Sequence, residues 1–138
     1  MSTKVLAVDD SITIREMLKH TLLGAGFEVD VAHDGEHGLE VLAAFCPDVI
    51  ITDINMPKLD GFGFIEKVRA DGAWRSTPIL VLTTESAPEL KARARNAGAT
   101  GWIVKPFDEA KLISAVSRVS VMALAGAGKE RFGEGAGS

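Results

Sequence analysis

The stretch Lys4-Val5-Leu6-Ala7-Val8-Asp9-Asp10 is a short apolar run that ends on two adjacent acids. A second run, Asp48-Val49-Ile50-Ile51-Thr52-Asp53, also ends on an aspartate. Short runs of this kind, rich in β-branched residues, are typical of buried parallel strands. In an open α/β sheet, the carboxyl ends of such strands line the ligand crevice. Carboxylates gathered there repel one another, so the pattern predicts a bound cation or a raised pKa, and therefore chemistry, at this edge.

The composition is that of an ordinary globular domain. The chain has 138 residues, 46% hydrophobic and 25% charged, which suits one domain with a full hydrophobic core. The net charge of −4 argues against nucleic-acid binding through a general basic surface. The sequence has no apolar stretch long enough to span a bilayer, and residues 1–4 lead into a strand without a signal peptide. We therefore expect a cytoplasmic protein that does not bind membranes.

Strand-like and helical patterns alternate five times along the chain. The predicted strands are 4–8, 27–32, 48–52, 78–83 and 101–104. The predicted helices are 12–24, 35–46, 61–71, 86–97 and 108–122. Strict alternation predicts a doubly wound α/β fold, with a parallel sheet, right-handed crossovers and helices on both faces.

Local signals refine the helices. Ser86 and Glu89 have the spacing of a capping box, which predicts a helix start at Ser86. Gly26 and Gly98 follow helical stretches and suit C-terminal caps. Cys46, the only cysteine, lies on the apolar stripe of the second helix and is predicted to be buried.

The last stretch of the chain differs in composition from the rest. Residues 123–138 are rich in glycine and alanine and have little to bury, so we interpret them as a flexible tail that follows a domain of residues 1–122. An extension of the fifth helix to about Ala125 is the alternative.

Polar residues follow four of the predicted strands. Asp9 and Asp10 end the first, Asp53 the third and Thr83 the fourth, and Lys105 follows the fifth. Parallel strands bring these residues to one edge, where the set suits a hard divalent cation and a phosphoryl group. Singly, each has an ordinary interpretation as a turn, loop or strand residue. Their shared edge and their order favour the functional interpretation.

These residues fall in a series of motifs that resembles the receiver domain of two-component response regulators, closest to the single-domain, CheY-like chemotaxis kind. The motifs are Val8-Asp9-Asp10-Ser11, Thr52-Asp53-Ile54-Asn55-Met56-Pro57-Lys58-Leu59-Asp60-Gly61, Leu82-Thr83-Thr84-Glu85, Gly98-Ala99-Thr100-Gly101-Trp102 and Lys105-Pro106-Phe107. The resemblance covers residues 4–120. It implies a flavodoxin-like sheet with strand order 2-1-3-4-5.

The resemblance implies a role for each acid. Asp53 is the phosphoacceptor and becomes a 4-aspartylphosphate. Asp10, Asp53 and the backbone carbonyl of Asn55 bind Mg²⁺, and Asp9 contributes through water. Lys105 pairs with Asp53 and then with the phosphoryl group, and the bond between Lys105 and the proline that follows it is cis.

The resemblance also implies a switch. Thr83 turns toward a phosphoryl oxygen and leaves space into which the aromatic residue at position 102 rotates. The family usually has Tyr or Phe there, whereas this chain has Trp102, whose indole is larger and carries a donor that needs a partner when buried. Asn55 and Glu85 occupy the positions that tune hydrolysis of the phosphoaspartate. Their polar character predicts a phosphorylated form that lives for seconds to minutes.

The expected function is therefore that of a signalling switch rather than an enzyme, because the chain catalyses only its own phosphorylation and dephosphorylation. Its phosphodonor is a sensor histidine kinase, a chemotaxis kinase by resemblance. Its output is a flagellar motor switch protein, or none if the chain is a phosphate sink. The alternative is a receiver fragment of a larger DNA-binding regulator, which the short tail argues against. A phosphatase of the haloacid-dehalogenase type needs its two aspartates two residues apart at the first strand, whereas Asp9 and Asp10 are adjacent.

Overall fold

The computed structural model of this chain describes residues 2–125. The strands are β1 (Lys4–Val8), β2 (Glu28–Ala32), β3 (Val49–Thr52), β4 (Ile79–Thr83) and β5 (Gly101–Val104). The helices are α1 (Ile12–Gly24), α2 (Gly35–Phe45), α3 (Gly61–Ala70), α4 (Pro88–Ala97) and α5 (Glu109–Ala125), with a short 3₁₀ turn, η1 (Gly72–Trp74), before β4. All the strands pair in parallel in the order β2-β1-β3-β4-β5, which confirms the predicted doubly wound topology.

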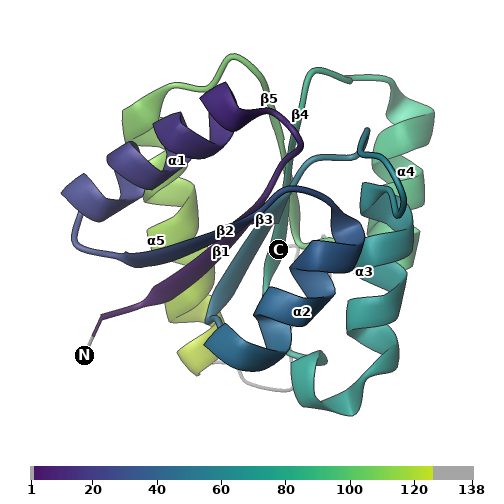
Figure 1. Cartoon of the computed structure of the whole chain (residues 1–138), viewed down its shortest axis with the longest axis horizontal. Helices are drawn as coiled ribbons and strands as arrows, with labels where there is room; N and C mark the ends of the chain where they lie inside the picture. The colour runs from purple at the N-terminus through teal and green to yellow at the C-terminus, as the bar shows by residue number, and fades with distance from the viewer. Residues whose placement is uncertain (1, 126–138) are drawn as a thin grey trace.

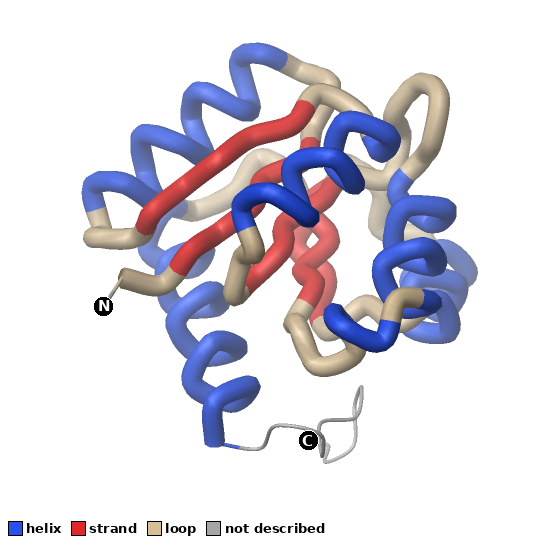
Figure 2. The backbone as a smooth tube through the Cα atoms, turned by 60° about the horizontal axis from the view of Figure 1, so that its bottom comes forward, coloured by secondary structure: helices blue, strands red, loops and turns tan. Residues whose placement is uncertain are grey.

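The sheet lies between two layers of helices. Figure 1 shows α1 and α5 on one face and α2, α3 and α4 on the other, and Figure 2 shows the strands enclosed between the helices. Successive side chains of a strand point to opposite faces. In β1, Val5 and Ala7 accordingly pack in the cluster with α1 and α5, whereas Leu6 and Val8 pack in the cluster on the other face. Both faces are therefore apolar, which explains the nearly continuous hydrophobic runs of the central strands.

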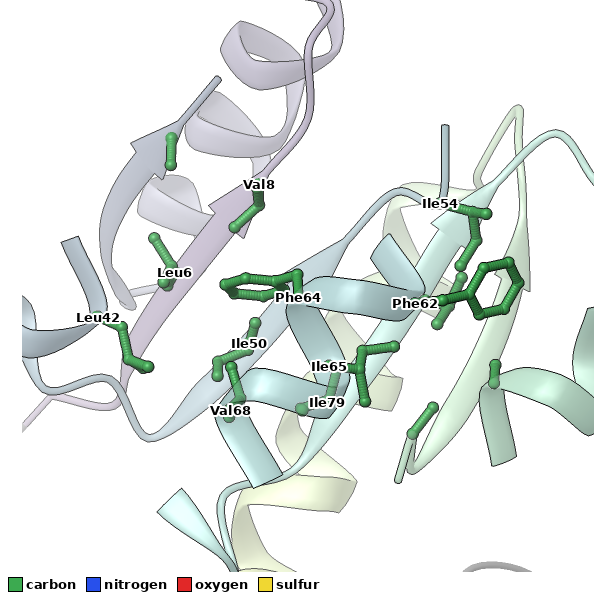
Figure 3. Packing of buried hydrophobic residues seen from close by; sticks show 14 residues of the cluster. Leu6, Val8, Leu42, Ile50, Ile54, Phe62, Phe64, Ile65, Val68 and Ile79 are labelled. Carbon is green, nitrogen blue, oxygen red and sulfur yellow. The ribbon is translucent and has the colours of Figure 1, made fainter. Parts of the chain in front are cut away.

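The packing beneath α3 fixes the loop that carries Asp53. Phe64 is fully buried and lies beside Ile50 and Val8 in the larger cluster (Figure 3). At the start of the helix, a Cβ atom added to Gly61 would meet the backbone oxygen of Asp53 and would lie 2.7 Å from Cα of Ile54. Only glycine fits this close approach of two backbone segments, so α3 and the end of β3 hold each other in place.

The helix starts differ in how they are capped. The side chains of Ser11, Asp34 and Asp60 accept hydrogen bonds from the first turns of α1, α2 and α3. The predicted capping box at Ser86 is wrong, because α4 begins at Pro88 and its N-cap residue is Ala87, which makes no side-chain hydrogen bond. The reason is the proline, which suits the first helical position and keeps the residue before it extended.

Of the two glycines predicted to cap helix ends, Gly98 does so, and Gly26 lies one residue beyond the cap. Gly98 caps α4 with a φ of 118°, and Gly26, just after the cap of α1, has a φ of 95°. The predicted burial of Cys46 is wrong. Helix α2 ends at Phe45, and Cys46 caps it in the left-handed conformation, with a φ of 54°, exposed to solvent.

Helix α5 continues to Ala125, three residues beyond the boundary at 122, in agreement with the longer alternative. The rest of the predicted tail, residues 126–138, lies outside the described residues. Between residues 2 and 125, no helix is both long enough and apolar enough to cross a membrane.

Candidate functional site

Three carboxylates meet where β1 and β3 end. The two strands are neighbours in the sheet, and Val8 pairs with Thr52, so the residues after them emerge side by side. Asp9, Asp10 and Asp53 each offer an oxygen that lies within 4.8 Å of the others. Asp9 and Asp53 are buried, with 1% and 7% of their surface exposed, whereas Asp10 is exposed.

Lys105 balances this negative charge. Its ammonium nitrogen lies 2.8 Å from Oδ2 of Asp9 and 2.8 Å from Oδ2 of Asp53. The loop that presents the lysine begins with a hydrogen bond from its backbone N–H to the carbonyl of Thr83, at 2.7 Å. The bond from Lys105 to Pro106 is cis, as predicted. Pairing with Asp53 was expected from the resemblance, and the structure adds Asp9 as a second partner.

The other oxygens of the two buried acids are bound by backbone donors. Oδ1 of Asp9 accepts a hydrogen bond from the N–H of Ser11 at 2.9 Å. Oδ1 of Asp53 accepts one from the N–H of Ile54 at 2.6 Å. Both carboxylates are therefore oriented at both ends. No hydrogen bond or ion pair within residues 2–125 holds the carboxylate of Asp10.

Burial and pairing change the pKa of two of these groups. Burial raises the pKa of Asp9 above its ordinary value of 3.8, and the hydrogen bond from Lys105 offsets this only in part. Burial by itself would lower the pKa of the lysine, but its hydrogen bonds to Asp53 and Asp9 outweigh that cost, and its pKa lies above 10.5. The ammonium therefore stays charged at neutral pH, where it can neutralise an anion at the site.

The oxygens of the acids fit a magnesium ion. Mg²⁺ prefers a small number of carboxylate oxygens together with waters and phosphate oxygens. The carboxylate of Asp10 is free to take a cation, and Asp9 and Asp53 add buried negative charge beside it. The donor set consists of oxygens alone, as a hard cation requires.

On the other side of the site, hydrogen bonds gather on Glu85. Its backbone N–H donates to Oγ1 of buried Thr83 at 3.4 Å, and its carboxylate accepts from Nδ2 of Asn55 at 3.4 Å. The indole N–H of half-buried Trp102 donates to its backbone carbonyl at 3.0 Å. Asn55 and Glu85, which the resemblance implies tune dephosphorylation, thus lie in contact, and the indole N–H of Trp102 has a hydrogen-bond partner.

Sequence reasoning missed one residue at this edge. Nη1 of Arg15, at the end of the first turn of α1, donates a hydrogen bond of 2.6 Å to the backbone carbonyl of Asp9. Side chains on a helix point back toward its N-terminus, so a long cation at the end of the first turn can reach the turn before the helix. This direction is the signal that could have identified it.

Comparisons with known proteins agree with this geometry. The family model of the response regulator receiver domain matches residues 5–117. The chain is similar to the response regulator MprA of Mycobacterium ulcerans, with 37% identity over 114 residues, which cover 83% of this chain and 48% of that protein. The chain therefore spans about half the length of the curated relatives it matches.

Solved structures give the same result. The chemotaxis protein CheY4 of Vibrio cholerae is 50% identical, with a TM-score of 0.83, over 86% of this chain and 99% of the other. A response regulator protein of Burkholderia multivorans is 48% identical, with a TM-score of 0.72, over 87% of this chain and 96% of the other.

Proposed function

This chain belongs to the response regulator receiver domain family, and from that premise we propose that it is a phosphorylation-activated switch that accepts a phosphoryl group from a histidine kinase on Asp53. The observation that carries the proposal is the position of Lys105, 2.8 Å from both Asp53 and Asp9. A half-buried ammonium at this point can neutralise both the acceptor and an incoming phosphoryl oxygen.

The acceptor is Asp53, whose carboxylate oxygen acts as the nucleophile. Its Oδ1 is held by the N–H of Ile54 and its Oδ2 by Lys105, so the carboxylate is oriented before a donor arrives. Phosphoryl transfer needs little from a protein beyond position and charge. The chain acts only on itself in this scheme, so we do not class it as an enzyme.

Mg²⁺ is the cofactor of this proposal. Asp10, Asp53 and the backbone carbonyl of Asn55 would hold it, with Asp9 acting through water. The bound ion would neutralise negative charge on the phosphoryl oxygens during transfer. The free carboxylate of Asp10 beside the two buried ones supports this assignment.

The output passes through Thr83 and Trp102. A phosphoryl group on Asp53 adds charge and strong acceptors, toward which the Thr83 hydroxyl can turn. This rotation of Thr83 would weaken the hydrogen bond that its hydroxyl accepts from the Glu85 N–H. The backbone carbonyl of Glu85 also accepts a hydrogen bond from the indole of Trp102, so the two residues are linked through Glu85. The surface of α4, β5 and α5 would change with it and bind the partner. Asn55 and Glu85, in contact at the mouth of the site, would set how fast the phosphoaspartate decays.

We place the switch in chemotaxis, in the cytoplasm, downstream of a chemotaxis kinase. The 50% identity with the Vibrio cholerae chemotaxis protein supports this assignment. The partner would be a flagellar motor switch protein, unless the chain serves as a phosphate sink. The second candidate is the receiver part of a longer regulator, and the greater length of the curated relatives favours it.

Phosphorylation of the purified chain tests the proposal. Incubation with acetyl phosphate and Mg²⁺ is expected to add one phosphoryl group, read by intact mass, and EDTA is expected to abolish the addition. Asp53→Asn should remain unlabelled, whereas Asp30→Asn, an exposed aspartate on β2, should be labelled like the wild type. Equal labelling of Asp53→Asn and wild type would refute Asp53 as the acceptor. A phosphotransfer profile against histidine kinases then separates a chemotaxis kinase from other donors.

A further inference from the structure

The turn between β1 and α1 has a brace that the proposed chemistry does not use. Half-buried Arg15 sends its guanidinium back from α1 to the carbonyl of Asp9, at 2.6 Å. A hydrogen bond from a charged donor at this distance belongs to the strong class. A second bond joins it, since Oγ of Ser11 accepts a hydrogen bond from the N–H of Ile14 at 3.3 Å and so fixes the start of the helix. The turn is thus tied to the helix at two points.

The three acids of the site differ in what holds them. Asp9 and Asp53 each have both carboxylate oxygens bonded, one by a backbone N–H and one by Lys105. Asp10 has no such bond within the described part of the chain, residues 2–125. Its carboxylate can therefore be positioned only through its own backbone.

That backbone is the part that Arg15 restrains. The carbonyl of Asp9 and the nitrogen of Asp10 belong to one peptide unit, which is planar. Fixing the carbonyl oxygen fixes the plane, and with it the direction in which Asp10 leaves the chain. We propose that Arg15 is a positioning residue for the cation site, which acts through the Asp9 carbonyl to aim the Asp10 carboxylate. This inference rests on the proposed function, since it assumes that the three acids bind Mg²⁺.

Loss of the Arg15 charge and loss of its hydrogen bond predict opposite changes in the affinity for Mg²⁺, so the inference can be tested. Arg15 carries a positive charge close to a site for a cation, so its charge alone disfavours Mg²⁺. Removing the charge should then tighten binding. Losing the brace should weaken binding, because the one free ligand is no longer held in place. Outer-shell partners of metal ligands typically change affinity by about 10-fold or more, which exceeds the effect of one screened charge.

The experiment is titration calorimetry of the full chain with MgCl₂, beginning from protein stripped with EDTA. Arg15→Met is expected to bind Mg²⁺ about tenfold more weakly than the wild type. Arg15→Gln, a milder change, is measured alongside so that the test stands if the first variant does not fold. Arg15→Lys keeps a charged donor of similar reach and should recover most of the lost affinity.

The control is Lys19→Met, which removes the same charge from an exposed position one turn further along α1. It should leave the affinity within about twofold of the wild type. Unchanged or tighter binding in both Arg15→Met and Arg15→Gln, with normal Mg²⁺ binding by the wild type, would overturn this inference alone. A wild type that binds no Mg²⁺ would refute the proposed cation site, and this inference with it.

Discussion

The two sides of the site are built differently. We call residues 9–15 and 53–61, together with Lys105, the acceptor side, and residues 83–102 the readout side. On the acceptor side, α1 and α3 each begin with a side-chain cap, from Ser11 and Asp60. On the readout side, α4 begins without one. Helix capping thus supports the side that would receive the phosphoryl group under the proposed function, and it leaves the other side less restrained.

The hydrogen bonds show the same contrast. On the acceptor side, those to the carboxylates of Asp9 and Asp53 are 2.6–2.9 Å long. On the readout side, Glu85 is held by Thr83 and Asn55 at 3.4 Å each, and its one shorter bond, at 3.0 Å, comes from Trp102. Preorganisation favours transfer, whereas a weakly held loop can rearrange at little cost. Each of the following substitutions tests this difference between the two sides.

Removing Lys105 should have the largest effect, because it breaks the acceptor side at its centre. Lys105→Met leaves the carboxylates of Asp9 and Asp53 buried without their cation. We expect a loss of about 3 kcal/mol in the free energy of unfolding at pH 7 without divalent ions. Urea unfolding in EDTA measures it.

The pH dependence of that loss identifies its cause. Because burial raises the pKa of Asp9, the folded protein holds a proton there at pH values where the unfolded chain has released it. Folding is therefore favoured as the pH falls through the raised pKa toward 3.8, and the charge left by Lys105→Met is removed in the same window. The difference between variant and wild type should shrink in acid. A difference that stays constant from pH 7 to pH 4 would show lost packing rather than unpaired charge.

Gly61→Ala should distort the acceptor side from beneath. The new methyl group would press on the backbone of Asp53 and Ile54, which cannot move aside as a flexible side chain can. We expect a loss of about 2 kcal/mol and a clear drop in labelling by acetyl phosphate. The control is Gly24→Ala at the end of α1, where nothing lies within 4 Å of the added atom. Equal stability of the two variants would contradict the close approach.

Trp102→Phe tests the shortest of the hydrogen bonds that hold Glu85. Without the indole N–H, the carbonyl of Glu85 loses its partner, at a cost of about 1 kcal/mol. Amide exchange of residues 84–90 should become faster. Trp74→Phe is the matched control, because that indole is also half-buried but donates no hydrogen bond within residues 2–125. Unchanged exchange in Trp102→Phe would mean that the bond does not restrain the loop.

Ala87→Ser should have the smallest effect, in the opposite direction. It gives α4 the kind of cap that α1 already has, at a position whose φ of −64° and ψ of 134° suit a capping residue. We expect a gain of about 0.5–1 kcal/mol, measured by urea unfolding. The fluorescence response of Trp102 to a phosphoryl analogue should become smaller as α4 becomes better anchored. A larger response would argue against the contrast between the two sides.

The topology and the meeting of the acids were predictable because they depend on periodicity and on the direction of parallel strands. The apolar runs fixed where β1 and β3 lie, and their ends placed Asp9, Asp10 and Asp53 at one edge. The start of α4 was not predicted correctly, since the capping-box spacing at Ser86 competes with a proline two residues later. A proline restricts the residue before it more strongly than one capping side chain can compensate.

Contacts between side chains and distant backbone were not predictable from patterns. The bond from Trp102 to the carbonyl of Glu85 uses an acceptor that every residue has. The bond from Arg15 to the carbonyl of Asp9 uses such an acceptor too, and only the direction of side chains on a helix could have indicated it. The second partner of Lys105 depends on how far its side chain extends from a loop. Cys46 was misplaced because α2 ends one residue before it, which turns an apolar stripe position into an exposed cap.

The position of β3 has a consequence for how such a domain can diversify. As the middle strand, it has β1 on one flank and β4 on the other, so Asp53 lies at the end of a strand that separates the two. Under the proposed function, substitutions on the β4 flank would change which protein is bound while the chemistry on the β1 flank stays the same. Related proteins could therefore acquire new binding partners through single surface substitutions while they keep the same phosphorylation chemistry.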